Sequence, residues 1–224
     1  MIDVICATRS TAEEFWSKAA LGLSLRRMSH DDRLRPRIYC ENRRGLPQLY
    51  NERIQSPDAA PTLLFIHDDV WLDDHFLAEH LAAGLEAFDV LGVAGNRRRA
   101  PMQPSWAFPT TEFKWDDRAN LSGIVSHGQG PFGVLSVFGR VPAECELLDG
   151  VMLAARRDTL RERQVGFDER FDFHFYDLDF CRSARAAGLR LSTWPIAITH
   201  QSEGGFGSNG WLENYKKYVA KWGD

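Results

Sequence analysis

The sequence is poor in cysteine and has no closely spaced pair of cysteines. Its four cysteines, Cys6, Cys40, Cys145 and Cys181, are widely separated and form no CxxC motif. This arrangement excludes a zinc ribbon and a dense disulfide framework. Three of the four lie within apolar runs, where buried free thiols are expected.

An excess of charge of one sign and long apolar runs are also lacking. The chain has 27 basic and 31 acidic residues, a balance that offers no basic surface of the kind that binds nucleic acid. No stretch reaches the roughly 18 continuous apolar residues of a membrane span. The opening "MIDVICATRS" has no charged segment followed by a long apolar one, as a secretory signal would. We therefore expect a cytoplasmic protein with no transmembrane segment and no nucleic-acid partner.

The sequence does contain a regular alternation of apolar strands and amphipathic helices. Its 224 residues, 44% of them hydrophobic, suit one globular domain. The predicted strands cover residues 2–7, 35–41, 61–67 and 90–95. The predicted helices follow a capping box at Ser10 and Glu13, then cover 46–56 and 73–88, the last beginning with Asp73 and Asp74. This order predicts an α/β fold with a central, mostly parallel (mixed) sheet flanked by helices.

Polar side chains gather at the carboxyl ends of these strands, where ligands of α/β sheets bind. They are Thr8 and Arg9, then Glu41, then His67, Asp68 and Asp69. Adjacent aspartates repel each other unless they are solvated, hydrogen-bonded or neutralised, and Mg²⁺ or Mn²⁺ suits such carboxylates. If the strand continues, His67 and Asp69 share one face and Asp68 points away. The alternative is that the two aspartates only cap a turn or the next helix.

Residues 96–146 contain scattered proline, glycine and aromatic residues with little sustained period. A region of this kind is usually functional or contains irregular strands. We expect it to shape the pocket of a second substrate, with Trp106 and Trp115 stacking on a ring. The alternative is that both tryptophans fill a small secondary core.

Acidic residues gather again in "FDFHFYDLDFCR", where Asp177 and Asp179 begin a predicted helix that ends at Gly188. Helix capping alone explains acids at this position. If the segment borders the same cleft, one carboxylate can act as a general base. His200 ends an apolar strand and is either a metal ligand or merely a strand-end histidine. The following loop, "EGGFGSNG", lacks the P-loop pattern and is interpreted as a lid.

Together these motifs resemble glycosyltransferase family 2, whose members have the GT-A (nucleotide-diphospho-sugar transferase) fold. In that family an apolar strand ends in a DxD-type motif, which "FIHDDV" matches. Later family motifs are matched, in order, by "LLDGVMLAARR", "GFDERFDFHFYDLDFCRSARAAG" and "WPIAITH". The resemblance covers most of the chain outside residues 96–146.

The resemblance implies a role for each matching residue. Asp69 and His200 would bind Mn²⁺ or Mg²⁺ at the donor's diphosphate, and Asp177 would be the catalytic base. The nucleotide-sugar, a UDP-sugar, would be held by Thr8, Arg9, Glu41, His67, Asp68 and Asp149. Lys216 and Lys217 follow the lid and either add charge to the diphosphate or lie on a solvated helix face.

Two positions depart from the family pattern. His67 replaces the first acid of the DxD motif, and Tyr176 replaces the glutamate before the catalytic aspartate. A histidine can bond ribose or ligate Mn²⁺, but it supplies no negative charge.

The sequence thus predicts a metal-dependent, inverting glycosyltransferase that moves a sugar from a UDP-sugar to an unknown carbohydrate, lipid-linked or small-molecule acceptor. One GT-A-like domain is expected over residues 1–224. Its predicted parts are a nucleotide-binding half (1–95), an acceptor and catalytic half (96–200), and a lid loop with a C-terminal helix (201–224). Two alternatives stay open: a nucleotidyltransferase of the same fold, and a degenerate nucleotide-sugar-binding protein, which the departures at His67 and Tyr176 favour.

Overall fold

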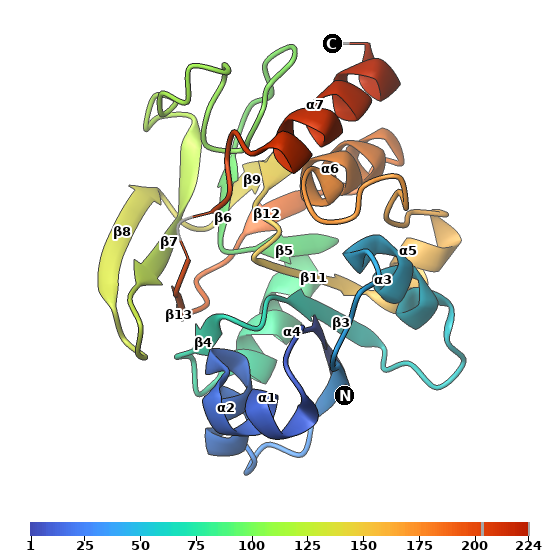
Figure 1. Ribbon diagram of the computed structural model, residues 1–224, viewed down its shortest axis with the longest axis vertical. Coiled ribbons are helices and arrows are strands. Elements are labelled where there is room, and N and C mark those ends of the chain that lie inside the picture. Colours follow the sequence, from blue (N-terminus) through green and yellow to red (C-terminus); the bar gives the residue numbers. More distant parts are fainter. Residues whose placement is uncertain (203, 224) are drawn as a thin grey trace.

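The computed structural model describes residues 1–202 and 204–223, which form two β-sheets with helices packed mainly against the larger one (Figure 1). The strands are β1 (Ile2–Ala7), β2 (Leu34–Tyr39), β3 (Thr62–Ile66), β4 (Val70–Leu72), β5 (Val90–Gly92), β6 (Ala94–Asn96), β7 (Leu121–His127), β8 (Val134–Gly139), β9 (Ala143–Cys145), β10 (Leu147–Leu148), β11 (Met152–Arg156), β12 (Leu191–Thr193) and β13 (Ile198–His200). The helices are α1 (Ala12–Lys18), α2 (Ala20–Arg27), α3 (Leu46–Gln55), α4 (Leu77–Ala87), α5 (Arg157–Glu162), α6 (Tyr176–Ala186) and α7 (Asn209–Trp222). Within these described ranges, no helix combines the length and the apolar character needed to cross a membrane.

The larger sheet has the strand order β2-β1-β3-β11-β5-β12-β9. β1 runs parallel to β2 and β3, β12 runs parallel to β5, and β11 runs antiparallel to both of its neighbours. In Figure 1, α3, α5 and α6 lie above this sheet, and α1, α2 and α4 lie below it. Strands covered on both faces need apolar side chains on both, which explains the buried run from Leu63 to Ile66 in β3. The predicted α/β fold with a mixed central sheet is confirmed.

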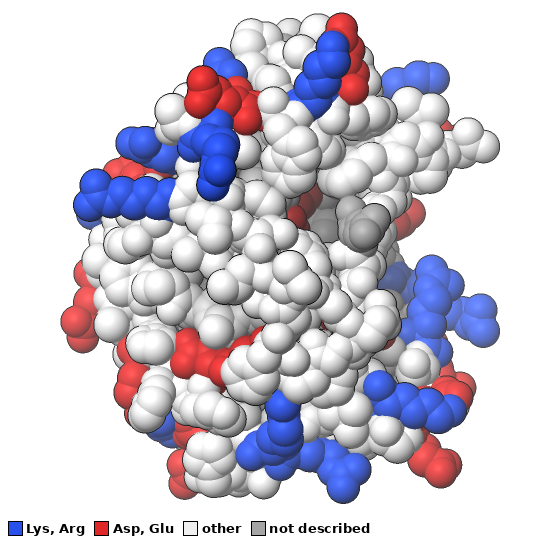
Figure 2. Space-filling model, turned by 90° about the vertical axis from the view of Figure 1, so that its left-hand side faces the viewer, with Lys and Arg blue, Asp and Glu red and all other residues white. Residues whose placement is uncertain are grey.

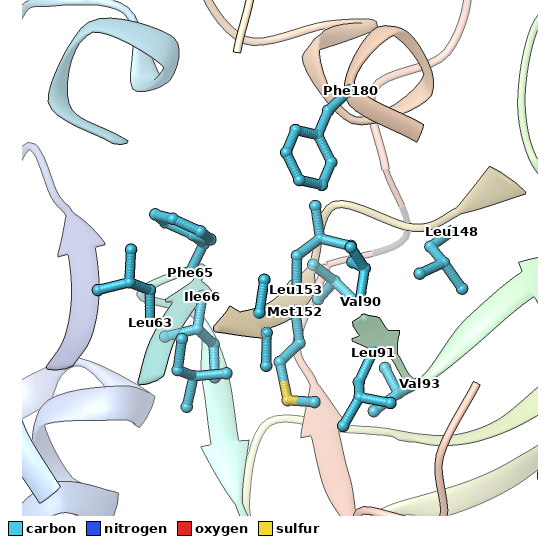
Figure 3. Close-up of a cluster of buried hydrophobic side chains, with 14 of the residues drawn as sticks. Leu63, Phe65, Ile66, Val90, Leu91, Val93, Leu148, Met152, Leu153 and Phe180 are labelled. Atoms are coloured by element: carbon cyan, nitrogen blue, oxygen red, sulfur yellow. The ribbon is translucent and has the colours of Figure 1, made fainter. Parts of the chain in front are cut away.

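The hydrophobic core occupies both faces of the larger sheet (Figure 3). On one face, Phe65 packs against Tyr50 of α3, with ring centroids 4.7 Å apart. On the other face, α4 approaches closely at Gly84, where an added Cβ would lie 2.5 Å from Leu91 Cδ1. This packing covers the sheet on both faces, on one side at β3 and on the other at β5.

The smaller sheet has the order β10-β6-β7-β13-β4, with β8 paired to β7. Two of its strands, β7 and β8, come from residues 96–146, which therefore contain the irregular strands that the sequence allowed, although a second sheet was not predicted. β13 pairs with both β4 and β7, so His200 lies opposite Val70 on one side and His127 on the other. That register places the end of β13 beside the residues that precede Val70.

Two predicted helix starts were wrong. The first capping box is formed by Thr11 and Glu14, one residue later than predicted, because α1 begins only at Ala12. Asp73 and Asp74 do not begin a helix, since α4 starts at Leu77. The Asp74 carboxylate accepts a hydrogen bond from the Phe76 N–H at 2.9 Å, which turns the chain before the helix.

A buried ion pair attaches the C-terminal helix α7 to α6, and the two helices lie side by side in Figure 1. Asp179 has no exposed side-chain surface, and its Oδ1 lies 2.6 Å from Lys221 Nζ. The Trp222 indole N–H also donates to Asp179 Oδ1, at 2.8 Å. Burial raises the pKa of Asp179, and the Lys221 ammonium opposes that rise.

Replacing Lys221 with Met should lower the free energy of unfolding by about 3–5 kcal/mol, because the buried Asp179 carboxylate would lose its cation. Urea denaturation of the two proteins measures this loss. Lys18→Met is the matched control, since Lys18 and Glu14 form an exposed pair at 3.4 Å of a kind that contributes about 0.5 kcal/mol. Equal losses for the two variants would show that the buried pair does not attach α7.

Candidate functional site

His67, Asp68 and Asp69 form a turn between β3 and β4 and do not continue the strand. The His67 N–H donates to the Val151 carbonyl at 3.2 Å, and the Asp69 carbonyl accepts from the Gln201 N–H at 3.1 Å. These bonds tie the turn to the start of β11 and to the end of β13. His67 lines one cavity and Asp68 lines another. The two side chains therefore point in different directions, as expected for a continuing strand, although the segment is a turn.

Three side chains from this turn and from β13 gather as a group that can hold a metal ion. His67, Asp69 and His200 each offer a ligand atom, and the three atoms lie within 4.8 Å of one another. His200 Nε2 lies 3.3 Å from Asp69 Oδ2. The other oxygen, Asp69 Oδ1, is buried and has no hydrogen-bond partner in the described part of the chain. Imidazole and carboxylate donors with one unsatisfied oxygen fit a divalent transition-metal cation.

The charges of this group are consistent with cation binding. Burial alone would raise the pKa of Asp69, but the hydrogen bond and charge of His200 lower it to about 2. Burial lowers the pKa of His67, which favours the neutral ring that metal ligation requires. Burial would lower the pKa of His200, but its hydrogen bond to Asp69 and the charge of Asp69 raise it, so a bound cation would replace the proton that His200 shares with Asp69.

The larger cavity has a volume of about 790 Å³ and lies against this group. Asp149 and Asp177 line it from the chain segments before β11 and within α6. Asp177 Oδ2 accepts a hydrogen bond from the Gly150 N–H at 2.9 Å. Asp149 Oδ2 accepts from the Trp106 indole N–H at 2.6 Å. Each carboxylate is thus held in a fixed orientation.

Asp177 has the ionisation expected of a proton acceptor near neutral pH. Burial raises its pKa to about 7, and the negative charge of Asp149 contributes in the same direction. Asp177 lies in the first turn of α6, where its carboxylate accepts from backbone N–H groups at the helix start, and its Oδ2 also accepts from the distant Gly150 N–H. Asp179, the other acid of this motif, points away and pairs with Lys221.

Aromatic side chains form much of the remaining wall of the larger cavity. They are Trp106, Phe108, Trp115, Phe138, Phe173, Phe175, Tyr176, Phe206 and Trp211. Trp106 is buried and packs edge to face on Trp115 and Phe138, whereas Trp115 is 56% exposed. The two tryptophans therefore pack together, as the secondary-core alternative expects, and they also line the cavity, while stacking on a substrate ring stays a prediction.

An apolar surface adjoins this aromatic wall on strand β8. Ser136 and Phe138 line the cavity, while Val134, Leu135 and Val137 of the same strand are 79%, 66% and 49% exposed. Figure 2 views the molecule from the side on which β8 lies in Figure 1, and charged residues there lie mainly toward the rim. Because successive side chains of a strand point to opposite faces, Leu135 and Val137 lie on the face of β8 that is turned away from the cavity.

The smaller cavity, of about 570 Å³, contains three of the predicted nucleotide-binding residues, Thr8, Arg9 and Asp68. Sequence reasoning missed three further residues of its wall, Asn42, Arg43 and Arg44. They directly follow Glu41, which was selected because it ends a predicted strand. Extending that selection by three residues along the chain would have found them. Phe173 lines both cavities, which therefore share a wall.

Two predicted residues lie apart from these walls. Glu41 has a left-handed backbone with φ 49°, is exposed, and is absent from the walls of both cavities. Lys216 is exposed on α7 and lines neither cavity. Of the predicted lid, Gly204, Gly205 and Phe206 line the larger cavity, and Glu203 lies outside the described residues.

Comparison with known proteins relates this arrangement to glycosyltransferases. No family model and no curated protein matches the sequence. Among solved structures, the chain is similar to S. aureus TarS, with 14% identity and a TM-score of 0.53 over 98% of this chain and 39% of that one. It is also similar to the mannosyltransferase PcManGT from Pyrobaculum calidifontis in complex with GDP-Man and Mn²⁺, with 13% identity and a TM-score of 0.51 over 100% of this chain and 65% of that one.

The chain spans less than two thirds of the length of either structure. At such identities the likeness concerns the fold. The chain has the GT-A glycosyltransferase fold that its sequence motifs predict.

Proposed function

We propose that this protein is a metal-dependent, inverting glycosyltransferase that uses a nucleoside-diphosphate sugar, with UDP as the nucleotide. The observation that carries the proposal is that His67 and His200 of the metal-binding group line the larger cavity together with Asp177, while the neighbouring Asp68 lines the smaller cavity. The fold it shares with the mannosyltransferase bound to GDP-Man and Mn²⁺ supports a nucleotide-sugar donor.

The smaller cavity suits the nucleoside part of the donor. Thr8 and Asp68 offer oxygen atoms to hydroxyl and N–H groups, and Arg9, Arg43 and Arg44 bring positive charge. The diphosphate would then lie near the turn at residues 67–69, between the cavities. A Mn²⁺ or Mg²⁺ ion held by Asp69, His200 and His67 supplies positive charge that stabilises a leaving diphosphate.

Asp177 is the proposed general base. As the acceptor hydroxyl oxygen bonds to the anomeric carbon, its proton passes to the Asp177 carboxylate, and the bond from that carbon to the diphosphate oxygen breaks with its electron pair. A pKa of about 7 suits this task, because the group is substantially ionised at neutral pH and still has useful basicity. The bond to Gly150 N–H leaves the second carboxylate oxygen, Oδ1, to receive the proton.

The acceptor is expected to carry an apolar or ring-shaped part. Trp106, Phe138 and their neighbours present ring faces and edges to the larger cavity, and such surfaces bind apolar groups well. Among carbohydrate, lipid-linked and small-molecule acceptors, this wall favours those with substantial apolar area.

A thermal-shift panel of UDP, GDP, ADP and CDP, each with Mn²⁺ or with EDTA, tests the proposal. UDP is expected to raise the melting temperature only when Mn²⁺ is present, and at 100 times its Kd the gain corresponds to about 2.7 kcal/mol. Equal stabilisation in Mn²⁺ and in EDTA would contradict a metal-bridged diphosphate. A larger shift with GDP would support the same type of reaction with a GDP-sugar as the donor.

A second candidate is a nucleotide-sugar-binding protein without transfer activity, which the tyrosine at position 176 favours because the family has glutamate there. Single-turnover assays with radiolabelled UDP-sugar, in which hydrolysis to water is also scored, separate the two functions. Release of free sugar faster than in the absence of protein supports the transferase. Tight binding with no release supports the binding protein.

A further inference from the structure

The two residues that depart from the family pattern contact each other. His67 Nε2 and the Tyr176 hydroxyl oxygen lie 2.9 Å apart, although 109 residues separate them in the sequence. His67 belongs to the turn after β3, and Tyr176 is the first residue of α6. The substitutions thus form one local unit beside the proposed metal site.

The hydrogen bonds of Tyr176 fix which nitrogen of His67 carries the proton. The Tyr176 hydroxyl donates its one proton to the Gly150 carbonyl, which can only accept, at 2.8 Å. The hydroxyl must therefore accept its other hydrogen bond, and His67 Nε2 is the donor. In the neutral ring this leaves the lone pair on Nδ1, the nitrogen free to ligate a cation.

The surroundings hold both partners in this arrangement. The Phe173 ring stacks on His67, with centroids 5.6 Å apart and an interplanar angle of 27°. Tyr176 is buried and packs against Tyr50 and Phe167. At Gly150, an added Cβ would lie 2.5 Å from the Tyr176 hydroxyl and 2.8 Å from Asp177 Cβ. Only glycine therefore lets this backbone segment receive Tyr176 and donate to Asp177 at once.

We propose that Tyr176 is a positioning residue that presents His67 Nδ1 as a metal ligand, and that the resulting donors, two imidazoles and one carboxylate, select Mn²⁺-like ions over Mg²⁺. This inference rests on the proposed metal site. Mg²⁺ prefers oxygen ligands and loses its water reluctantly, whereas Mn²⁺ accepts imidazole. With Asp69 as the one anionic donor of the group, the site has little to attract a hard cation.

Tyr176→Phe tests the positioning role, because it removes the hydroxyl and keeps the ring. On the full chain, isothermal titration calorimetry with MnCl₂ is expected to show a loss of about 10- to 100-fold in Mn²⁺ affinity, as for other residues that orient a metal-ligating histidine. Tyr215→Phe is the matched control, since the Tyr215 hydroxyl also donates to a backbone carbonyl, Met102, at 2.8 Å. Its Mn²⁺ affinity should equal that of the unchanged protein.

His67→Asp provides a second, independent readout. It should raise the affinity for Mg²⁺ relative to Mn²⁺, and pulsed electron paramagnetic resonance of bound Mn²⁺ should show coupling to one imidazole nitrogen instead of two. In the His67→Asp background, adding Tyr176→Phe should change the Mn²⁺ affinity by less than about twofold, because the coupling between the two residues is gone. Circular dichroism confirms that each variant is folded.

The outcomes separate this inference from the proposed function. If the unchanged protein binds no Mn²⁺, the metal site and the proposed function both fail. If it binds Mn²⁺ and Tyr176→Phe binds it equally well, the positioning role fails and the proposed function stands. Equal affinities of the unchanged protein for Mn²⁺ and Mg²⁺, or coupling to a single nitrogen, would overturn the selectivity.

Discussion

Asp177→Asn is expected to lower the rate of sugar transfer by about 100- to 10,000-fold, the usual contribution of a general base, while UDP still binds in the presence of Mn²⁺. An amide has nearly the size of the carboxylate and can still accept from Gly150 N–H, but it cannot take up the acceptor's proton. Single-turnover release of labelled sugar measures the rate, and the UDP-induced thermal shift measures binding. Unchanged turnover would assign the base to another residue.

The same variant should be more stable than the unchanged protein at alkaline pH. The pKa of Asp177 is raised from 3.8 to about 7 in the folded state, so the unfolded chain releases this proton first. Stability contributed by the neutral carboxyl is therefore present below about pH 4 and is lost as pH rises toward 7. Because an amide does not ionise, the difference in melting temperature between the variant and the unchanged protein should grow from pH 5 to pH 8. Loss of activity together with gained stability distinguishes a catalytic carboxylate from a structural one.

Asp69→Asn should abolish the difference between Mn²⁺ and EDTA in the UDP thermal shift. Asp69 supplies the one carboxylate of the group formed with His67 and His200, and its buried Oδ1 has no other partner in the described part of the chain. Without that charge, the two imidazoles are expected to hold a divalent cation poorly.

Asp68→Asn is the matched control for this experiment, because the neighbouring aspartate faces the smaller cavity. It should weaken UDP binding through the nucleoside and leave the dependence on Mn²⁺ intact. If the two variants behave alike, the assignment of Asp68 to the nucleoside and of Asp69 to the metal is wrong.

The central sheet was predictable because the signals for it are local. The unbroken run from Leu63 to Ile66 shows a strand covered on both faces, and the polar residues after it had to lie at the sheet edge. His200 was harder to place, since it reaches Asp69 only through the pairing of β13 with β4 across more than 120 residues. Nothing in the residues around His200 sets that pairing, and only the resemblance to a family indicated it.

The smaller sheet and the roles of Glu41 and Tyr176 could not be read from local pattern. Strands β7 and β8 have an irregular register, with a shift between Gly123 and Ile124, which hides the alternation of a regular strand. Glu41 lies at the end of a predicted strand, where ligand-binding residues were expected. Its backbone is left-handed, and the next three residues line the cavity in its place. In the sequence, Tyr176 favours a protein without transfer activity. Its contact with His67 is not visible there, because the two residues are distant in sequence.

The wall that the two cavities share at Phe173 has a consequence for inhibitor design. A nucleoside fragment in the smaller cavity and an aromatic fragment in the larger one would be neighbours across a single side chain. Joining them through a short linker makes the second binding event intramolecular, with an effective concentration in the millimolar range for short flexible linkers. A bisubstrate compound of this kind would imitate donor and acceptor in one molecule, and His67, which stacks on Phe173, would lie beside its linker.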